Sequence, residues 1–532
     1  MNFEIIDNDE IVTCRICGEK CKRIYGQHLK FKHENITTKE YKKMFPDAPI
    51  MATSDKKTTS KNSGKHMKNE VLKVYSPFTR ELIDTVPLHS EQEAEKMVQI
   101  AFDLLKRSHP VPLHERITIL ERLIPMMESS IESLTIMAAK EGGKPYLDSK
   151  VEVLRAIQGV KSTIDTIRTM HGTEIPMGIT ASSQHKLAFT MHEPIGVVFA
   201  ISAFNHPLNL IVHQVIPAIA VGAPVIIKPA SSTPRTCLTF IDMIHQAGLP
   251  KEWCQALICT STLAQQLVGD SRIAMLSFIG SAEIGWKLRS LLAPGMRCAL
   301  EHGGIAPSIL AHDVHISEYV EKIVKGAMYH SGQVCVSTQQ LHVHASCIDE
   351  VAAALKDRVS RFAVGDPLNE ESEGGPLIHP HEVQRVQSWI HQAVSGGAQI
   401  ICGGNTISET IHEPTVLLSP SLNAKVSTAE IFGPVLCLYP YTDIEVAMHN
   451  INASPFGFQA SIFTNNTDIA FNVMTKLNAS AVMHNDHTAF RVDWMPFGGR
   501  DVSGLGWGGI PHTIKEYSRE KMMIFHSQHI RR

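Results

Sequence analysis

Amphipathic helical segments alternate with short, wholly apolar runs along the chain from residue 70 onward. Hydrophobic positions recur with a helical period at about 90–107, 114–139 and 146–170, and Glu141-Gly-Gly-Lys-Pro145 separates the last two segments. The apolar runs that follow, such as residues 194–202 and 223–227, are rich in valine and isoleucine, as expected for strands buried in a parallel sheet. This alternation predicts an α/β fold.

The residues before position 70 have a different character. Residues 51–69 are polar, rich in Lys, Ser and Thr, and without periodicity, which predicts a flexible linker. Residues 11–68 hold 14 Lys or Arg against 5 Asp or Glu, although the whole chain has a net charge of -3. The asymmetry indicates a basic appendage on a mildly acidic body.

Composition limits the class of protein further. A chain of 532 residues exceeds the usual size of one domain. Its first ten residues lack the basic and apolar regions of a secretory signal, and it has no run of about 20 apolar residues. We therefore expect a cytoplasmic protein that does not enter a membrane. The 11 cysteines are odd in number and mostly scattered, which favours reduced thiols over a disulfide framework.

Residues 1–50 contain a candidate metal site formed by Cys14, Cys17, His28 and His33. Two cysteines separated by two residues, followed by two histidines separated by four, match the ligand types and spacing of a small structural Zn²⁺ site. The segment resembles bacterial Ros/MucR-like zinc fingers. Its basic residues predict a nucleic-acid contact, and the competing interpretation is a zinc-stapled protein-interaction module with a solvated basic face. These basic residues are Lys20, Lys22, Arg23, Lys30, Lys32, Lys42 and Lys43.

Three apolar runs end in polar motifs, at the strand ends where parallel sheets bind ligands. The first ends at Ala203-Phe204-Asn205-His206-Pro207, and the second at Lys228-Pro-Ala-Ser231. The third, Leu276–Ile279, enters a helix through Gly280-Ser281-Ala-Glu-Ile-Gly285, where a helix amino terminus suits a pyrophosphate. Taken alone, Gly-Ser here is more often a helix cap than a pyrophosphate site.

A cysteine and a glutamate carry the candidate chemistry. Cys335 ends Ser-Gly-Gln-Val-Cys, and Glu301 precedes the Gly303-Gly304 bend, a combination that indicates a thiol nucleophile with a water-activating base. A lone cysteine is more often a small core residue. Here two further motifs accompany it, Glu430-Ile-Phe-Gly-Pro and Pro496-Phe-Gly-Gly.

In this order and at these separations the motifs resemble those of the aldehyde dehydrogenase superfamily, over about residues 70–528. The resemblance implies a Rossmann-like NAD(P)-binding domain from residues 70–175 and 195–301, and an α/β catalytic domain from residues 302–505. It also implies oligomerisation segments at 176–194 and 506–532, the first being a hairpin that adds to a neighbour's sheet. A homodimer or homotetramer follows from the same resemblance.

The resemblance assigns the catalytic roles. Cys335 attacks the aldehyde, its backbone N–H and the Asn205 amide bind the oxyanion, and Glu301 activates water for thioester hydrolysis. Members that acylate coenzyme A commonly lack this acid, so a free carboxylate is the expected product. A coenzyme A-acylating semialdehyde dehydrogenase remains the alternative enzyme. A nucleic-acid-binding regulator with a cofactor- or aldehyde-sensing body is the alternative from another class.

The resemblance also implies a cofactor set and a substrate set. Lys228 contacts the adenosine ribose, and Ser231 stands where NAD-preferring enzymes often have Glu, which favours NADP slightly over NAD. His302 replaces the Leu that usually follows Glu301. The other cofactor residues are Phe204, Gly280, Ser281, Gly285, Glu430 and Phe432, and the substrate residues are His206, Arg491 and Phe497.

The polar His206 predicts a short polar aldehyde. The stretch at 484–493 looks most like the lactaldehyde, glyceraldehyde-3-phosphate and sulfolactaldehyde branch of the family. Arg491 would suit an anionic group, although a structural salt bridge to Asp493 or another acid explains it equally well. Neutral and anionic 2-hydroxyaldehydes are not separated by these residues.

Overall fold

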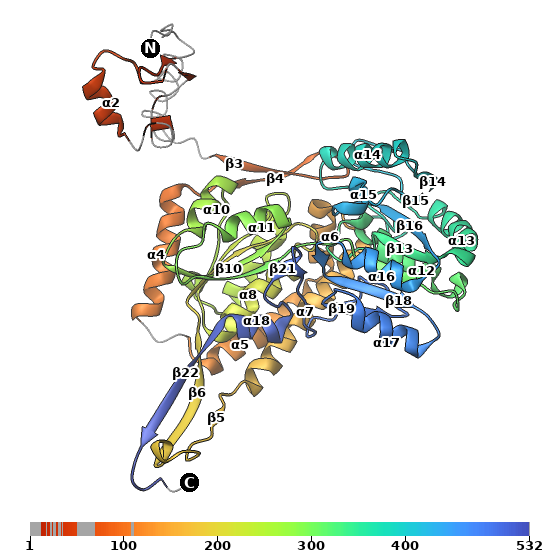
Figure 1. Cartoon of the computed structure of the whole chain (residues 1–532). Helices are drawn as coiled ribbons and strands as arrows, with labels where there is room; N and C mark the ends of the chain where they lie inside the picture. Colours follow the sequence, from red (N-terminus) through yellow and green to blue (C-terminus); the bar gives the residue numbers. More distant parts are fainter. Residues whose placement is uncertain are drawn as a thin grey trace. The chain divides into compact units, whose positions relative to one another are not determined.

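The structure is a computed structural model that describes residues 12–17, 19–21, 24, 28–29, 33, 36–50, 70–107 and 111–530. The chain divides into two compact units, Met1–Glu70 and Val71–Arg532 (Figure 1). The predicted linker at 51–69 and the basic residues Lys22, Arg23, Lys30 and Lys32 lie outside the described residues. None of the helices in the described part combines the length and apolarity that a membrane crossing needs.

The first unit is built from very short elements. Strand β1 (Val12–Thr13) pairs antiparallel with β2 (Lys20–Cys21), and helix α2 (Thr38–Met44) follows. The Thr37 side chain and Glu40 form a capping box at the start of α2. Among the described residues of this unit, the buried apolar core is small and consists of Val12, Cys14, Ile24, Leu29, Tyr41 and Ala48.

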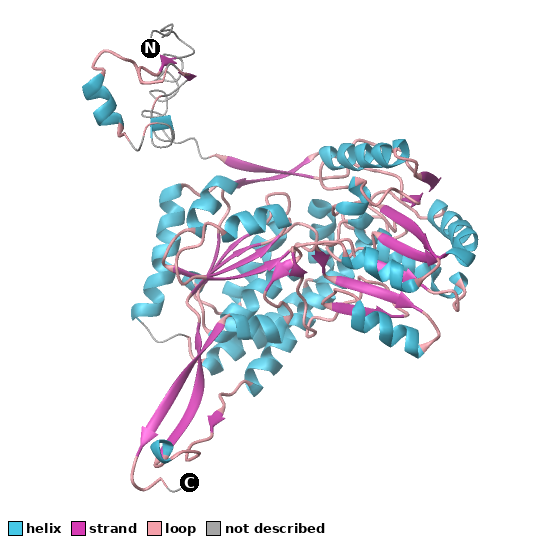
Figure 2. Ribbon diagram, viewed as in Figure 1, coloured by secondary structure: helices cyan, strands magenta, loops and turns pink. Residues whose placement is uncertain are grey.

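The second unit contains a six-stranded sheet that is parallel except for one short edge strand. The strand order is β21-β11-β10-β7-β8-β9, and β21 is the antiparallel strand. Figure 2 shows that helices cover this sheet, as the predicted α/β alternation requires. The strands are β7 (Val197–Ile201), β8 (Val225–Lys228), β9 (Cys254–Ala256), β10 (Ile273–Ile279), β11 (Arg297–Glu301) and β21 (Gly504–Leu505). The helices are α4 (Glu91–Arg107), α5 (Leu113–Ser129), α6 (Ile131–Gly142), α7 (Tyr146–Thr169), α8 (Asn209–Val221), α9 (Pro234–Gln246), α10 (Ser261–Val268), α11 (Ala282–Arg289) and α18 (Ile510–Glu516).

One predicted helix is two helices in the structure. The segment expected at 114–139 breaks at Ser130, where α5 ends and α6 begins. Serine favours helix ends because its side chain and backbone form competing local hydrogen bonds. The predicted break at Glu141-Gly-Gly-Lys-Pro145 is present, with Gly143 in the left-handed conformation (φ 71°) that glycine adopts without strain.

A seven-stranded sheet forms the other half of the second unit, in the order β14-β15-β16-β13-β12-β18-β19. All pairs are parallel except β14 with β15. The strands are β12 (Pro307–Leu310), β13 (Gln340–His344), β14 (Gln399–Cys402), β15 (Thr415–Leu418), β16 (Val435–Tyr441), β18 (Gln459–Phe463) and β19 (Ala481–His484). The helices are α12 (Ile316–Met328), α13 (Ile348–Ser360), α14 (Pro380–Ser395), α15 (Lys425–Thr428), α16 (Ile444–Asn452) and α17 (Thr467–Lys476).

A three-stranded antiparallel arm projects from the second unit in Figure 1. Its order is β22-β6-β5, so the carboxy-terminal strand pairs along the full length of β6. The arm consists of β5 (Glu174–Ile175), β6 (Lys186–Pro194) and β22 (Ser518–His526). Two further two-stranded ribbons pair β3 (Val71–Tyr75) with β4 (Leu82–Pro87), and β17 (Phe456–Gly457) with β20 (Arg500–Asp501).

Candidate active site

The loop that carries Cys335 has an unusual backbone. It begins at the short 3-10 helix Tyr329–Gly332, in which His330 (φ 48°) and Ser331 (φ 53°) take left-handed conformations that non-glycine residues rarely adopt. Ser331 Oγ donates to the Gly375 carbonyl (2.6 Å), and Gln333 Nε2 donates to the Pro376 carbonyl (3.1 Å). These bonds hold the loop in a single shape, a common device where a reactive group is presented.

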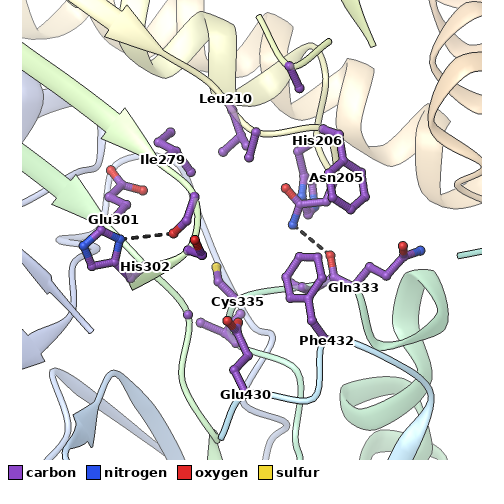
Figure 3. Close-up of a pocket in the computed structure, with 18 of the residues that line it drawn as sticks. Asn205, His206, Leu210, Ile279, Glu301, His302, Gln333, Cys335, Glu430 and Phe432 are labelled. Carbon is purple, nitrogen blue, oxygen red and sulfur yellow. Dashed lines mark hydrogen bonds between the residues drawn. The ribbon is translucent and has the colours of Figure 1, made fainter. Parts of the chain in front are cut away.

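Asn205 lies on the turn after β7 and reaches this loop directly. Its Nδ2 donates to the Gln333 carbonyl at 2.8 Å, two residues before Cys335 (Figure 3). The turn is held from below by Glu152 of α7, whose Oε1 accepts from the backbone N–H groups of Leu208 and Asn209 (2.8 and 3.0 Å). A fully buried Lys144 pairs with the same carboxylate. The amide is therefore fixed beside the thiol before any substrate enters.

Glu301 is the last residue of β11. In Figure 3 Cys335 lies between Glu301 on one side and Asn205 on the other, with Glu430 below. The Glu301 carboxylate packs against Gly508, where an added Cβ would lie 2.3 Å from Oε1. Burial raises the pKa of Glu301, and Arg491 opposes that rise. A carboxylate in such a setting is suited to accept a proton.

Cys335 is half-buried. Burial raises its pKa to about 12, Arg491 opposes that rise, and Glu430 and Glu301 add to it. Burial likewise raises the pKa of Glu430 to about 8, and no described residue forms a hydrogen bond with its Oε1. The thiol thus needs a base to form the nucleophilic thiolate.

A cavity of about 630 Å³ brings the separate motifs together. Lys228, Ser231 and Gly285 are not part of its lining. Lys228 is buried at the end of β8, and the space above Gly285 is filled by the His302 ring, 1.9 Å from where a Cβ would be. The lining includes Phe204, Asn205, His206, Gly280, Ser281, Glu301, Cys335, Glu430, Phe432, Arg491 and Phe497.

His302 joins the glutamate to the glycine turn. Its Nδ1 lies 3.1 Å from the Gly280 carbonyl, and its ring packs edge-on against Phe278 and Trp286. The Gly280 N–H donates to the Glu301 carbonyl (3.1 Å). The imidazole stands at the position where the resemblance expects Leu.

Sequence reasoning missed one wall of the cavity. Glu382, Arg385 and Trp389 of α14 face it. Arg385 pairs with Glu382 (2.7 Å), donates to the Ile431 carbonyl (2.7 Å) and lies over the Trp389 ring at 4.8 Å. These residues occur in an ordinary amphipathic helix. Their helical spacing, which puts them on one face, is the one sequence feature that could have indicated this wall.

Arg491 does not form the salt bridge to Asp493 that was one interpretation of its neighbourhood. Asp493 pairs with Arg155 (2.8 Å). Arg491 instead lies over the Phe497 ring, with Cζ 3.5 Å from its centroid. Among the described residues no carboxylate lies within ion-pair distance of Arg491, and its Nε is buried without a hydrogen-bond partner. The guanidinium thus has no direct ion pair with a described carboxylate, although Glu301 and Asp493 are near enough to interact with its charge.

The first unit contains a separate cluster of potential metal ligands. One ligand atom from each of Cys14, Cys17, His28 and His33 lies within 4.8 Å of the other three. His28 Nε2 and His33 Nε2 are 3.2 Å apart, and each is close to one cysteine sulfur (3.7 and 3.5 Å). The four predicted ligands thus converge on one point.

Comparison with known proteins identifies the family to which the second unit is similar. Residues 64–523 match the model of the aldehyde dehydrogenase family. The chain is 31% identical over 457 residues to 3-sulfolactaldehyde dehydrogenase of Priestia aryabhattai, covering 86% of this chain and 95% of the relative. It is 32% identical over 472 residues to lactaldehyde dehydrogenase of Methanococcus vannielii, covering 87% and 99%.

Two solved structures have the same fold. Aldehyde dehydrogenase 21 from Physcomitrella patens, in complex with the reaction product succinate, aligns with a TM-score of 0.84 and 29% identity over 87% of this chain and 97% of that one. Glyceraldehyde-3-phosphate dehydrogenase GapN from Methanocaldococcus jannaschii, in complex with NADP, aligns with a TM-score of 0.83 and 29% identity over 87% of this chain and 100% of that one. The thiol, amide and carboxylate that the family motifs contain lie in one cavity of this structure. The family match and these relatives show that the chain belongs to the aldehyde dehydrogenase family and is an NAD(P)-dependent oxidoreductase that acts on an aldehyde.

Proposed function

We propose that the chain oxidises a short polar aldehyde to its carboxylate, with Cys335 as nucleophile, Asn205 as oxyanion donor and Glu301 as the hydrolytic base. The observation that supports this most is the convergence of the three side chains, from three distant parts of the sequence, in one cavity. A sensor would have no need of all three groups.

Cys335 Sγ forms a bond to the aldehyde carbon, and the carbonyl oxygen becomes an oxyanion. The second N–H of the Asn205 amide, not used by Gln333, and the Cys335 backbone N–H donate to that oxygen. Glu301 takes the thiol proton through water. Without the negative oxygen the carbon would not release hydride, so the covalent step makes the oxidation possible.

Bound NAD or NADP supplies the acceptor for that hydride. The chain fits such a cofactor at Glu430, whose buried Oε1 lacks a hydrogen-bond donor that a ribose hydroxyl would supply. The absence of a side chain at Gly303 lets this carboxylate pack against the backbone there, since a Cβ would lie 1.5 Å from Oε1. Ser231 puts no carboxylate at the adenosine ribose, which favours NADP slightly.

The thioester left on Cys335 is then hydrolysed. Glu301 first passes the thiol proton to solvent and then removes a proton from the attacking water, whose oxygen bonds to the thioester carbon as the thiolate of Cys335 leaves. The raised pKa of Glu301 makes it a stronger base than an exposed carboxylate. The acid product leaves and Cys335 is restored.

The substrate is a 2-hydroxyaldehyde or a similar short polar aldehyde, and one with an anionic group fits best. Relatives are named for lactaldehyde and 3-sulfolactaldehyde. His206 and Phe497 line the thiol end of the cavity, and the unpaired guanidinium of Arg491 supplies a charge that a carboxylate, sulfonate or phosphate would neutralise.

The first unit is proposed to bind one structural Zn²⁺ through Cys14, Cys17, His28 and His33. Two thiolates and two imidazoles are a usual tetrahedral zinc set, and the metal would compensate for the small core. Nucleic-acid binding through this unit stays a prediction. Nζ of Lys42, one of the basic residues, donates to the Pro46 and Ala48 carbonyls of the same unit (3.1 and 2.7 Å).

The arm is proposed to join chains into a homodimer or homotetramer by adding a strand to a neighbour's sheet. Its apolar side chains support this, because Met191, Met522, Ile524 and Phe525 are each about half exposed. Size-exclusion chromatography with light scattering measures the state, and a monomer at micromolar concentration contradicts the proposal.

The deciding experiment follows the reduced-nicotinamide absorbance band for purified protein with NAD and with NADP. The aldehydes are lactaldehyde, glyceraldehyde 3-phosphate, succinate semialdehyde and propanal, and Cys335→Ala is the control. Turnover that disappears in the variant supports the proposal, and turnover that requires coenzyme A points to the acylating alternative. A folded protein without turnover on any pair contradicts the proposal.

A further inference from the structure

The carboxylate of Asp493 is the centre of a buried network beside the cavity. It is 2% exposed and accepts hydrogen bonds from three side chains of the second unit. Arg155 donates twice, Nε to Oδ2 (3.1 Å) and Nη2 to Oδ1 (2.8 Å). Asn209 Nδ2 and His213 Nε2 lie 3.0 and 2.8 Å from Oδ1. Asp493 is thus fully engaged without Arg491.

The contact with Asp493 fixes the tautomer of His213. A carboxylate only accepts, so Nε2 of His213 carries the hydrogen, and Nδ1 of the neutral ring keeps its lone pair. Arg491 Nη2 lies 3.4 Å from that Nδ1 and can only donate. Burial, followed by the charge of Arg491, lowers the pKa of His213 to about 4, so the ring stays neutral. Asp493, His213 and Arg491 therefore form a chain with one consistent direction of donation.

Arg491 has a second support on its other side. Its guanidinium lies over the Phe497 ring, and both groups line the cavity that contains Cys335. The buried Nε of Arg491 has no hydrogen-bond partner among the described residues. The guanidinium, which lines the cavity, therefore has donor capacity left for a ligand that enters it.

We infer that His213 is a positioning residue that holds Arg491 ready to receive the anionic group of the aldehyde, with Asp493 fixing the His213 tautomer. The inference rests on the proposed function for the identity of the substrate. It extends that function by assigning selectivity between anionic and neutral aldehydes to a side chain that is not itself part of the cavity lining.

Two amide variants separate this role from a merely structural one. In His213→Gln the amide N–H reaches the position of Nε2 and keeps Asp493 bonded, but no acceptor stands at Nδ1. In His213→Asn the side-chain carbonyl occupies the position of Nδ1 and keeps Arg491 bonded, while Asp493 retains Arg155 and Asn209. A structural role predicts similar damage from both changes. A positioning role predicts that only His213→Gln slows the reactions of anionic reagents and anionic substrates.

The first measurement does not depend on turnover. Iodoacetate and iodoacetamide alkylate the same thiol and differ in charge, so the ratio of their rates at Cys335, followed by mass spectrometry of its peptide, reports the cation beside the thiol. We expect His213→Gln to lower this ratio by about 10-fold, the scale of one charge-assisted contact, and His213→Asn to change it by less than about 2-fold. An unchanged ratio in His213→Gln, or equal losses in both variants, would overturn the inference.

The second measurement uses succinate semialdehyde and propanal as anionic and neutral substrates. We expect His213→Gln to lower kcat/KM for succinate semialdehyde by about 10-fold, mainly through KM, with propanal within about 2-fold of the unmodified chain. Parallel losses on both aldehydes count against the inference. If neither aldehyde is oxidised by the unmodified chain but the alkylation ratio responds, the proposed function fails and the positioning role stands. If the unmodified chain oxidises both aldehydes and the alkylation ratio does not change in His213→Gln, the proposed function stands and the positioning role fails.

Discussion

Replacing Asn205 with alanine is expected to slow aldehyde oxidation by about 100- to 1,000-fold in a chain that still folds. Asn205 is 5% exposed, and one of its two amide hydrogens is committed to the Gln333 carbonyl at 2.8 Å. The other is free for the oxyanion on the Cys335 adduct. One preorganised donor of this kind typically contributes about 2.7–4 kcal/mol to the barrier, which corresponds to that range of rates.

The same change leaves the buried Gln333 carbonyl without its donor, at a cost of about 1–3 kcal/mol in the free energy of unfolding. A domain with typical stability of about 5–15 kcal/mol tolerates that loss. The burst of reduced cofactor in stopped-flow absorbance measures the oxidation step separately from hydrolysis. Asn205→Asp, of equal size but without the donor, should be at least as slow. Iodoacetamide should still label Cys335 in both variants. A folded Asn205→Ala with kcat/KM within about 3-fold of the unmodified chain would refute the reasoning.

Four further results are expected. Glu301→Gln should accumulate the thioester, seen as added mass on the Cys335 peptide, with turnover at least about 100-fold lower. Because burial raises the pKa of Glu301, the base is lost as the pH falls through that raised value, so kcat should decline at a pH above the usual range of a glutamate carboxyl, and a decline confined to that usual range contradicts the assignment. Lys144→Met leaves the Glu152 carboxylate buried without its cation and should lower the free energy of unfolding by about 3–5 kcal/mol, measured in denaturant, with most of the loss recovered in Lys144→Met/Glu152→Gln. Chelation should release about one Zn²⁺ per chain, detected by a colorimetric indicator, and none from Cys14→Ser; metal bound equally by both proteins would remove the zinc proposal.

The sequence predicted those parts of the site that occur as contiguous motifs at strand ends. Phe204 to His206 follow β7, Gly280 follows β10 and Glu301 ends β11, and parallel strands bring such ends to one edge. The aldehyde dehydrogenase fold and the enzyme class are confirmed by the family match and the structural relatives. The roles of the individual residues stay predictions.

Other features depend on contacts that no local pattern encodes. Asp493 was recognised as a possible partner of Arg491, yet its ion pair is with Arg155, 338 positions away. Arg385 lies on an amphipathic helix whose residues gave no reason to single it out. Which charged residues pair with each other depends on tertiary packing, and the hydrophobic periodicity of the sequence does not predict it.

The strained loop before Cys335 depends on parts of the chain that are synthesised after it. Its shape is held by carbonyl groups at Gly375 and Pro376, and Gly332 packs so closely on Gly433 that an added Cβ would lie 2.1 Å from its oxygen. A growing chain that has passed Cys335 therefore has the cysteine but not the segments that hold its loop in place. The last of these segments, at Gly433, is made about a hundred residues after the cysteine itself.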